Sequence, residues 1–120
     1  MSSSHYQKTE KKFFECKSMK QAEELVGNCG DGEVMISIHD PQGMYLKVSD
    51  SSQTVFGHNA ADLIGNSAYD YFHPKDYQRI LQSHAKVTLR PEIDRVNYRV
   101  VTSAKETVSL FTLSRQIREE

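Results

Sequence analysis

The chain has 120 residues, a hydrophobic fraction of 38% and a formal net charge of −1. This length suits one domain with one buried core, and the near-zero charge supplies no field that would hold nucleic acid. The polar start of the chain is not a signal peptide, and no segment approaches the roughly 20 apolar residues of a membrane span. We therefore expect a soluble intracellular protein, cytoplasmic or nuclear, that contacts neither nucleic acid nor membrane directly.

The N-terminal quarter of the chain combines a polar segment with a short amphipathic one. Residues 1–17 are rich in serine and lysine, which is typical of a flexible tail. Ser18 followed by Gln21 predicts a capped start for a helix over residues 18–27. The two cysteines, Cys16 and Cys29, are too few for a disulfide framework and indicate structural thiols in a reduced compartment.

The next segment alternates apolar and polar residues, which is the pattern of β-strands. It does so over residues 34–39 and again over residues 44–48. Asp40-Pro41-Gln42-Gly43 lies between them, with proline and glycine at positions that favour a tight turn. We expect a hairpin with Ile36, Ile38 and Leu46 toward the core.

Helical patterns follow and then give way to strands again. Three short helical segments lie between residues 55 and 72, each ended by a glycine or by His73-Pro74. Pro74 suits the first turn of a longer helix that ends near residue 89. Residues 96–100 and 108–112 alternate as two longer strands. The residues expected at core spacing on the longer helix are Tyr77, Ile80, Leu81, His84 and Val87.

This order of elements resembles the PAS family over about residues 18–117. Within the family, the pattern is closest to the second PAS repeat of bHLH-PAS transcription factors of the Clock and hypoxia-factor types. The resemblance rests on Asp40-Pro41-Gln42-Gly43, Ser49-Asp50-Ser51-Ser52, Val55-Phe56-Gly57, Ala61-Asp62-Leu63-Ile64-Gly65, Tyr71-Phe72-His73-Pro74-Lys75-Asp76, Ser83-His84 and Asn97-Tyr98-Arg99.

The resemblance implies an α+β fold in which an antiparallel sheet is flanked by short helices. It places a PAS domain at residues 18–120, with its core at residues 33–117, after a tail at residues 1–17. PAS sheets have five strands, whereas only four are predicted here, so the fifth is apparently absent from the chain. The local candidate for its place is the segment of residues 11–16 with Phe13 and Phe14; a strand from a partner is the alternative.

The cofactors of PAS relatives can be tested against individual positions. Photoactive flavin relatives carry a reactive cysteine at the position where this chain has Ala68, so no flavin adduct can form. Haem-binding relatives place a histidine nearer the start of the long helix than His84, which we expect to be a core residue bonded to backbone. The histidines and cysteines lack zinc-ligand spacing. We therefore predict no cofactor and no metal.

No catalytic motif accompanies the titratable residues. Asp62, Asp70 and Asp76 are separated and suit helix capping or surface exposure, and His73 suits the entry of the helix beside Pro74. The chain has no phosphate-binding loop, nucleophile elbow or dinucleotide fingerprint. We predict that it is not an enzyme and has no catalytic residues.

Two functions remain, and each has its own candidate residues. The first is an interaction module of a signalling or transcription-regulating protein, which dimerises with its own kind or with another PAS domain through the outer sheet face and the N-terminal segment. The alternative is a sensor whose apolar cavity holds a ligand or cofactor. The interface candidates are Met35, Tyr45, Val101, Phe111, Leu113, Phe13 and Phe14; the cavity candidates are Ile36, Ile38, Leu46, Val55, Phe56, Leu63, Tyr69, Ile80, Tyr98, Val100 and Leu110.

Overall fold

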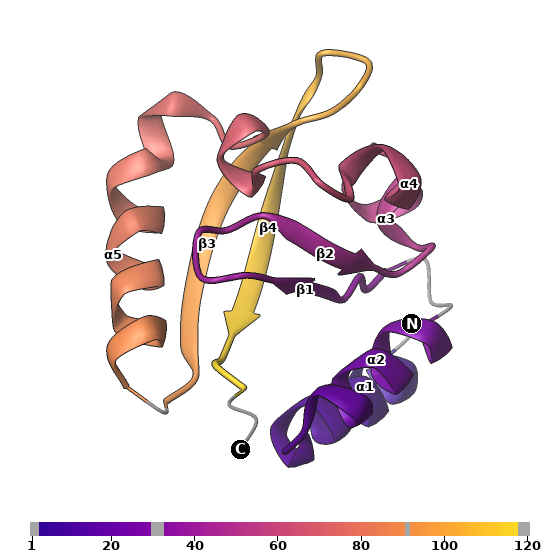
Figure 1. Ribbon diagram of the computed structural model, residues 1–120. Helices are drawn as coiled ribbons and strands as arrows, with labels where there is room; N and C mark the ends of the chain where they lie inside the picture. Colours follow the sequence, from indigo (N-terminus) through magenta and orange to yellow (C-terminus); the bar gives the residue numbers. More distant parts are fainter. Residues whose placement is uncertain (1–2, 30–32, 91, 118–120) are drawn as a thin grey trace. The chain divides into compact units, whose positions relative to one another are not determined.

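The computed structural model describes residues 3–29, 33–90 and 92–117, which form helices and antiparallel strands (Figure 1). The described residues up to Ser67, together with Ile117, make one compact unit, and Ala68–Gln116 make a second. The predicted α+β class is confirmed, with four strands in two antiparallel pairs among the described residues.

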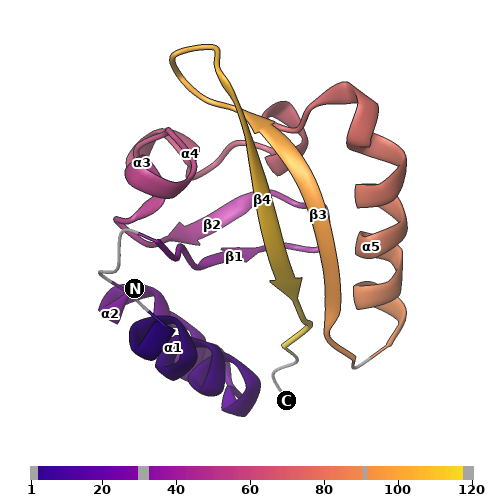
Figure 2. The same ribbon diagram turned by 180° about the vertical axis from the view of Figure 1, so that it is seen from behind.

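The first unit begins with two helices that lie side by side, α1 (Ser3–Glu15) and α2 (Met19–Asn28), as Figures 1 and 2 show. A flexible tail was predicted where α1 lies. One feature of the sequence does indicate this helix. Half-buried Thr9 and Phe13 and, just after the helix, buried Cys16 follow the i, i+4, i+7 spacing of one helix face. Residues 11–15 are therefore helical, and the prediction that this segment supplies a strand is wrong.

Helix α2 starts as the sequence predicts. The Ser18 hydroxyl accepts a hydrogen bond from the Gln21 amide at 3.1 Å, which caps the first turn. The Gln21 side chain in turn accepts from the amide of Lys17 at 2.6 Å, one residue before the cap. Ala22 and Val26 are the buried residues of the helix.

The first hairpin pairs β1 (Ser37–His39) with β2 (Tyr45–Val48) and is shorter than predicted. Ile38 pairs with Lys47 and His39 with Tyr45, so Leu46 is an extra, bulged residue. The extra residue reverses which side chains of β2 on its far side face the core and which face solvent. Tyr45 is 3% exposed and Leu46 is 46% exposed, so the prediction of Tyr45 on an outer surface and Leu46 at the core is wrong.

Two single-turn helices, α3 (Ser52–Val55) and α4 (Ala60–Leu63), complete the first unit. Each is too short to be stable alone, and burial of an adjacent apolar residue anchors each of them. Phe56 follows α3 and is 2% exposed, and its ring lies 6.4 Å from that of Tyr45. Leu63 ends α4 and is fully buried.

The second unit begins with two 3-10 turns, η1 (Ala68–Asp70) and η2 (Pro74–Asp76), and continues directly into α5 (Tyr77–Leu89). A long hairpin of β3 (Asp94–Val101) and β4 (Thr107–Ser114) follows, with α5 alongside β3 (Figure 2). The strands pair without interruption from Asp94 opposite Ser114 to Val101 opposite Thr107.

The core of the second unit lies where α5 and the 71–73 segment meet β3. Val100 is fully buried, and Ile80 and Phe72 are nearly so. Phe72 forms a bridge with Val100 on the edge of β3 that β4 leaves open. Tyr77 and Leu81, which were predicted at core positions, are 37% and 49% exposed. Their prediction is wrong because Ile80 and Ser83 form the buried face of α5.

Candidate functional site

The β3–β4 hairpin presents a face on which an aromatic ring is exposed to solvent. Phe111 is 59% exposed and pairs with Asn97 across the strands. Leu113 pairs with Arg95 two positions along, and side chains two apart share a face of a strand. We call this surface the Phe111 face; the cross-strand pairs that share it are Arg95 and Leu113, Asn97 and Phe111, Arg99 and Ser109, and Val101 and Thr107.

The predicted interface residues are exposed to different degrees. Phe111 and Phe14 are exposed, Phe14 by 39% on α1, where its ring lies 6.0 Å from that of Phe13. Tyr45 is buried and is not available to a partner. Met35, Phe13, Val101 and Leu113 are half-buried.

The other face of β3 contributes to an aromatic cluster inside the second unit. The Phe72 ring lies 5.0 Å from Tyr98 and 5.2 Å from Tyr69, and both pairs meet edge to face. Tyr77 adds a further edge-to-face contact with Tyr69, at 6.3 Å, and donates its hydroxyl hydrogen to the Tyr69 carbonyl at 2.8 Å. The cluster joins η1, α5 and β3.

A polar pair lies within this aromatic cluster. The Tyr69 hydroxyl lies 2.8 Å from Nδ1 of His84, so a tyrosine hydroxyl bonds the ring that was predicted to bond backbone. Burial raises the pKa of Tyr69. Burial also raises the pKa of Tyr98, against a smaller lowering by its hydrogen bond with Thr112. Both phenols therefore stay neutral at physiological pH and act as hydrogen-bonding groups in apolar surroundings.

An ion pair at the edge of β3 is the feature that sequence reasoning missed. Asp76 is 3% exposed, and its carboxylate accepts hydrogen bonds from Nε and Nη2 of Arg99 at 2.9 and 2.7 Å. It also accepts from the Arg99 amide at 2.7 Å. These bonds hold the pKa of Asp76 well below its ordinary value of 3.8, although desolvation opposes them. The two residues are 23 positions apart, and no local pattern links residues at that separation, so this pairing could not be predicted.

The histidine before Pro74 has the structural role that was predicted for it. His73 is the N-cap of η2, and its Nδ1 accepts a hydrogen bond from the Lys75 amide at 3.2 Å. Its own amide donates to the Arg99 carbonyl at 2.9 Å. His73 therefore shapes the entry to α5. In the part of the chain that the structure describes, no group of three or more histidine, cysteine or acidic residues is placed to hold a metal ion.

The predicted cavity residues divide between the two units. The first unit holds Ile36, Ile38, Leu46, Val55, Phe56 and Leu63, and the second holds Tyr69, Ile80, Tyr98, Val100 and Leu110. Within the second unit, Tyr69 and Tyr98 meet through Phe72, and Tyr98 pairs with Leu110 across the strands. The fully buried members of the set are Phe56, Leu63 and Val100.

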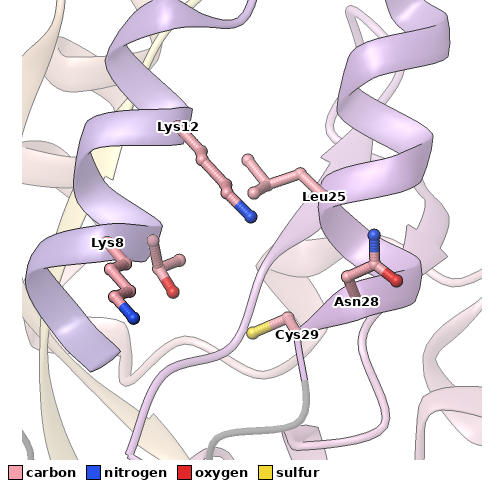
Figure 3. Close-up of a pocket in the computed structure, with 6 residues that line it drawn as sticks. Lys8, Lys12, Leu25, Asn28 and Cys29 are labelled. Carbon is pink, nitrogen blue, oxygen red and sulfur yellow. The ribbon is translucent and has the colours of Figure 1, made fainter. Parts of the chain in front are cut away.

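The two N-terminal helices enclose a small hollow of about 150 Å³ (Figure 3). Lys8 and Lys12 extend into it from α1, and Leu25 and Asn28 line it from α2. The Cys29 sulfur also lies at this hollow, where it donates to the Val34 carbonyl at 3.3 Å. The thiol is thus engaged with backbone, as expected of a structural cysteine.

None of the helices in the described ranges combines the length and the apolar character needed to cross a bilayer.

Comparison with known proteins identifies the family of this chain. The PAS fold family matches residues 45–120. Protein cycle from Drosophila melanogaster is 32% identical over 59 residues, which make up 49% of this chain and 14% of that protein. The chain therefore spans a small part of that relative's length.

Solved structures agree with this placement. Two structures of the PAS-B domain of Drosophila melanogaster Cycle, the wild type with bound ethylene glycol and a single-residue variant with bound glycerol, are 26% identical with a TM-score of 0.68. Each match covers 72% of this chain and 84% of the other. A PAS domain of an HTR-like protein from Haloarcula marismortui, 18% identical, has a TM-score of 0.64 over 95% of this chain and 89% of its own, and supports the fold alone.

The predicted resemblance to the second PAS repeat is confirmed by the likeness to the Cycle PAS-B domain. The family match covers more than half of the chain. The chain belongs to the PAS fold family.

Proposed function

We propose that this chain is an interaction domain of a signalling or transcription-regulating protein of the cytoplasm or nucleus, and that it works by pairing rather than by catalysis. Its partner is a PAS domain, either a second copy or a different chain, and the Phe111 face is the contact surface. The observation that carries the proposal is the 59% exposure of Phe111 on a regular, eight-residue strand.

The composition of the Phe111 face supports docking. Aromatic side chains supply much of the binding energy at protein interfaces, where they are buried at the centre and surrounded by polar groups. Phe111 has this arrangement, because Arg95 and Asn97 lie on the same face beside it. Half-buried Leu113 extends the apolar area along the hairpin, and half-buried Val101 lies on the same face beyond the Arg99–Ser109 pair. A partner that covers Phe111 would remove a large apolar surface from water.

The test is a charge placed at the centre of this face. We expect Phe111→Glu to weaken self-association by on the order of tenfold or more, because it buries a carboxylate in place of a ring. Sedimentation of the full chain over a range of concentrations measures this change, and circular dichroism checks the fold. Ile64→Glu is the matched control, since Ile64 is 48% exposed in the other unit and should leave association unchanged.

One result would narrow this function, and another would contradict it. A wild type that remains monomeric at every concentration removes the homodimer and leaves only a different PAS chain as partner. Equal weakening by Ile64→Glu and Phe111→Glu shows that added charge, not the Phe111 face, controls association.

A second candidate function is ligand sensing, which the Tyr69–His84 pair favours. A polar pair among aromatic rings offers one hydrogen-bonding point in apolar surroundings, as small-molecule sites commonly do. Structures of the related Cycle PAS-B domain carry small polyols. We propose that, in this function, a small and largely apolar molecule binds beside Tyr69, with no coloured cofactor.

Two measurements test the sensing function. Titration of the labelled chain with cyclohexanol, a largely apolar molecule with one hydroxyl group, followed by NMR, should shift the Tyr69 and His84 signals before others, and Tyr69→Phe should weaken that response. Shifts spread evenly over the chain would argue against a site there. Absorption bands of a flavin or haem in the purified protein would contradict the expectation of no coloured cofactor.

A further inference from the structure

The solvent side of α5 carries an uninterrupted row of apolar residues. Tyr77, Leu81, Ala85 and Leu89 follow one another at four-residue intervals, which places them along one line of the helix surface. Tyr77 is 37% exposed, Leu81 49% and Leu89 79%, and Ala85 is also exposed. We call this row the α5 ridge.

Most of the α5 ridge takes no part in the packing of its own unit. Its first residue, Tyr77, contacts Tyr69, whereas Leu81, Ala85 and Leu89 are exposed and Ile80 and Ser83 are the buried residues of the helix. Gln78 and Gln82, which lie beside the ridge, are exposed and uncharged. Leu89, the most exposed large apolar residue of the described chain, lies at the end of this row. Leucines in a row on a solvent face indicate a surface that a partner covers.

The surroundings of the α5 ridge are basic. Lys75, Arg79, Lys86 and Arg90 lie on or next to α5, and all four are exposed. Asp76 is 3% exposed and is bound by Arg99 and, at 3.3 Å, by Arg79, so the cations of this stretch that remain for a partner are Lys75, Lys86 and Arg90. An exposed carboxylate, Glu92, follows Arg90 by two residues. Lys86 lies 3.9 Å from Asp94, but its side chain is 66% exposed. A chain with a net charge of −1 thus concentrates positive charge along this helix.

We propose that the α5 ridge binds an amphipathic helix of a partner protein whose apolar stripe is flanked by acidic residues. A ridge one residue wide, formed at four-residue intervals, fits the groove between side chains of another helix. The cations around the ridge select acidic flanks and oppose a second copy of α5, which would bring the same cations together. A bilayer surface requires a broader apolar face than a single row with glutamines beside it.

The experiment titrates the labelled full-length chain with two synthetic peptides and follows backbone signals by NMR. One peptide is an amphipathic helix with leucines on one stripe and glutamates beside them; the other has lysine in place of every glutamate. We expect the acidic peptide to shift the signals of α5 first, and added salt to weaken its binding. The basic peptide should bind on the order of tenfold more weakly or not at all.

Variants with matched exposure locate the binding surface. Leu81→Glu and Leu89→Glu should each weaken binding of the acidic peptide by on the order of tenfold. Leu46→Glu, at a leucine of nearly equal exposure in the other unit, should leave it unchanged. Lys86→Glu should weaken the acidic peptide and strengthen the basic one. Unchanged thermal unfolding of the variants shows that the fold is intact, as expected of exposed positions.

Each of the following results overturns the proposal. Neither peptide binds, or both bind equally, or Leu46→Glu weakens binding as much as Leu81→Glu. Self-association that Leu81→Glu abolishes identifies a second copy as the occupant. Ridge-dependent binding to vesicles that contain phosphatidylserine, with no binding of the acidic peptide, identifies a membrane surface as the occupant.

Discussion

The two hairpins of this chain are built from similar residues but differ in regularity. In β3–β4, eight residue pairs follow one another without a shift. In β1–β2, only three pairs form, and Leu46 is displaced between two of them. The long hairpin obeys simple alternation, so its exposed and buried faces can be read from the sequence. The short hairpin does not, because one bulged residue reverses the facing of every side chain beyond it.

Contacts outside the strands explain why the short hairpin accepts a bulge. The Tyr45 amide donates to the Asn66 carbonyl, and the Tyr45 carbonyl accepts from the Gly65 amide, both at 2.9 Å. Tyr45 therefore exchanges backbone hydrogen bonds with the segment after α4 as well as pairing with β1. The Tyr45 ring is buried near the Phe56 ring, and this burial determines which side chains of β2 face the core. In the long hairpin, β3 also pairs with a second segment, residues 71–73. This pairing leaves the alternation of buried and exposed side chains along β3 unchanged.

The largest expected effect tests the bulge directly. Removing the buried ring in Tyr45→Ala should lower the free energy of unfolding by about 3–5 kcal/mol. Leu46→Ala should change it by less than about 0.5 kcal/mol, because Leu46 is 46% exposed. Urea denaturation of both variants measures the difference. If the alternation rule held in this hairpin, the two effects would be reversed.

The next effect concerns the open edge of the long hairpin, where Asp76 binds Arg99. The pKa of Asp76 in the folded chain lies below its ordinary value of 3.8, chiefly because of the hydrogen bonds from the Arg99 side chain. A carboxyl with a lowered folded pKa stabilises the fold above its unfolded pKa, and this contribution is lost as the pH falls below that value. Asp76→Asn should therefore lower the melting temperature at neutral pH.

The pH dependence separates this charge effect from a general loss of packing. The gap between the melting temperatures of wild type and Asp76→Asn should narrow as the pH falls below about 3.8, because the carboxyl then takes up a proton in the unfolded chain while the ion pair keeps it ionised in the folded one. Asp70→Asn, at an exposed position of the same unit, is the control and should show little change at any pH. A gap that stays constant with pH would mean that the ion pair does not stabilise the edge of β3.

The smallest effect compares two glycines of the first unit. Gly65, whose amide bonds Tyr45, has a φ of +90°, and a side chain there would meet no atom within 4 Å. Gly65→Ala should cost about 1–2 kcal/mol through backbone strain alone. Gly27 in α2 has equally open surroundings, so Gly27→Ala should stabilise the chain by about 0.5–1 kcal/mol. Thermal unfolding of both variants measures these opposite signs; two effects of the same sign would show that φ does not control them.

Local signals in the sequence determined much of this fold. The capping residue Ser18, the turn at Asp40-Pro41-Gln42-Gly43 and the cap at His73 all act within a few residues of their own position, and each was predicted. The period-two pattern of β3 and β4 likewise placed Phe111 at an exposed position. The PAS resemblance followed from the order of these local elements and did not depend on any long-range contact.

Tertiary structure alone decided the features that depend on residues distant in sequence. The helical state of α1, the burial of Tyr45, the Asp76–Arg99 pair and the exposed α5 ridge each depend on what packs against a segment, not on the segment's own pattern. A strand slipped by one residue, or a helix turned to bury Ile80 and Ser83, keeps the same local propensity but presents different side chains. Local propensity therefore determined where the elements lie, and packing determined which of their faces meet solvent.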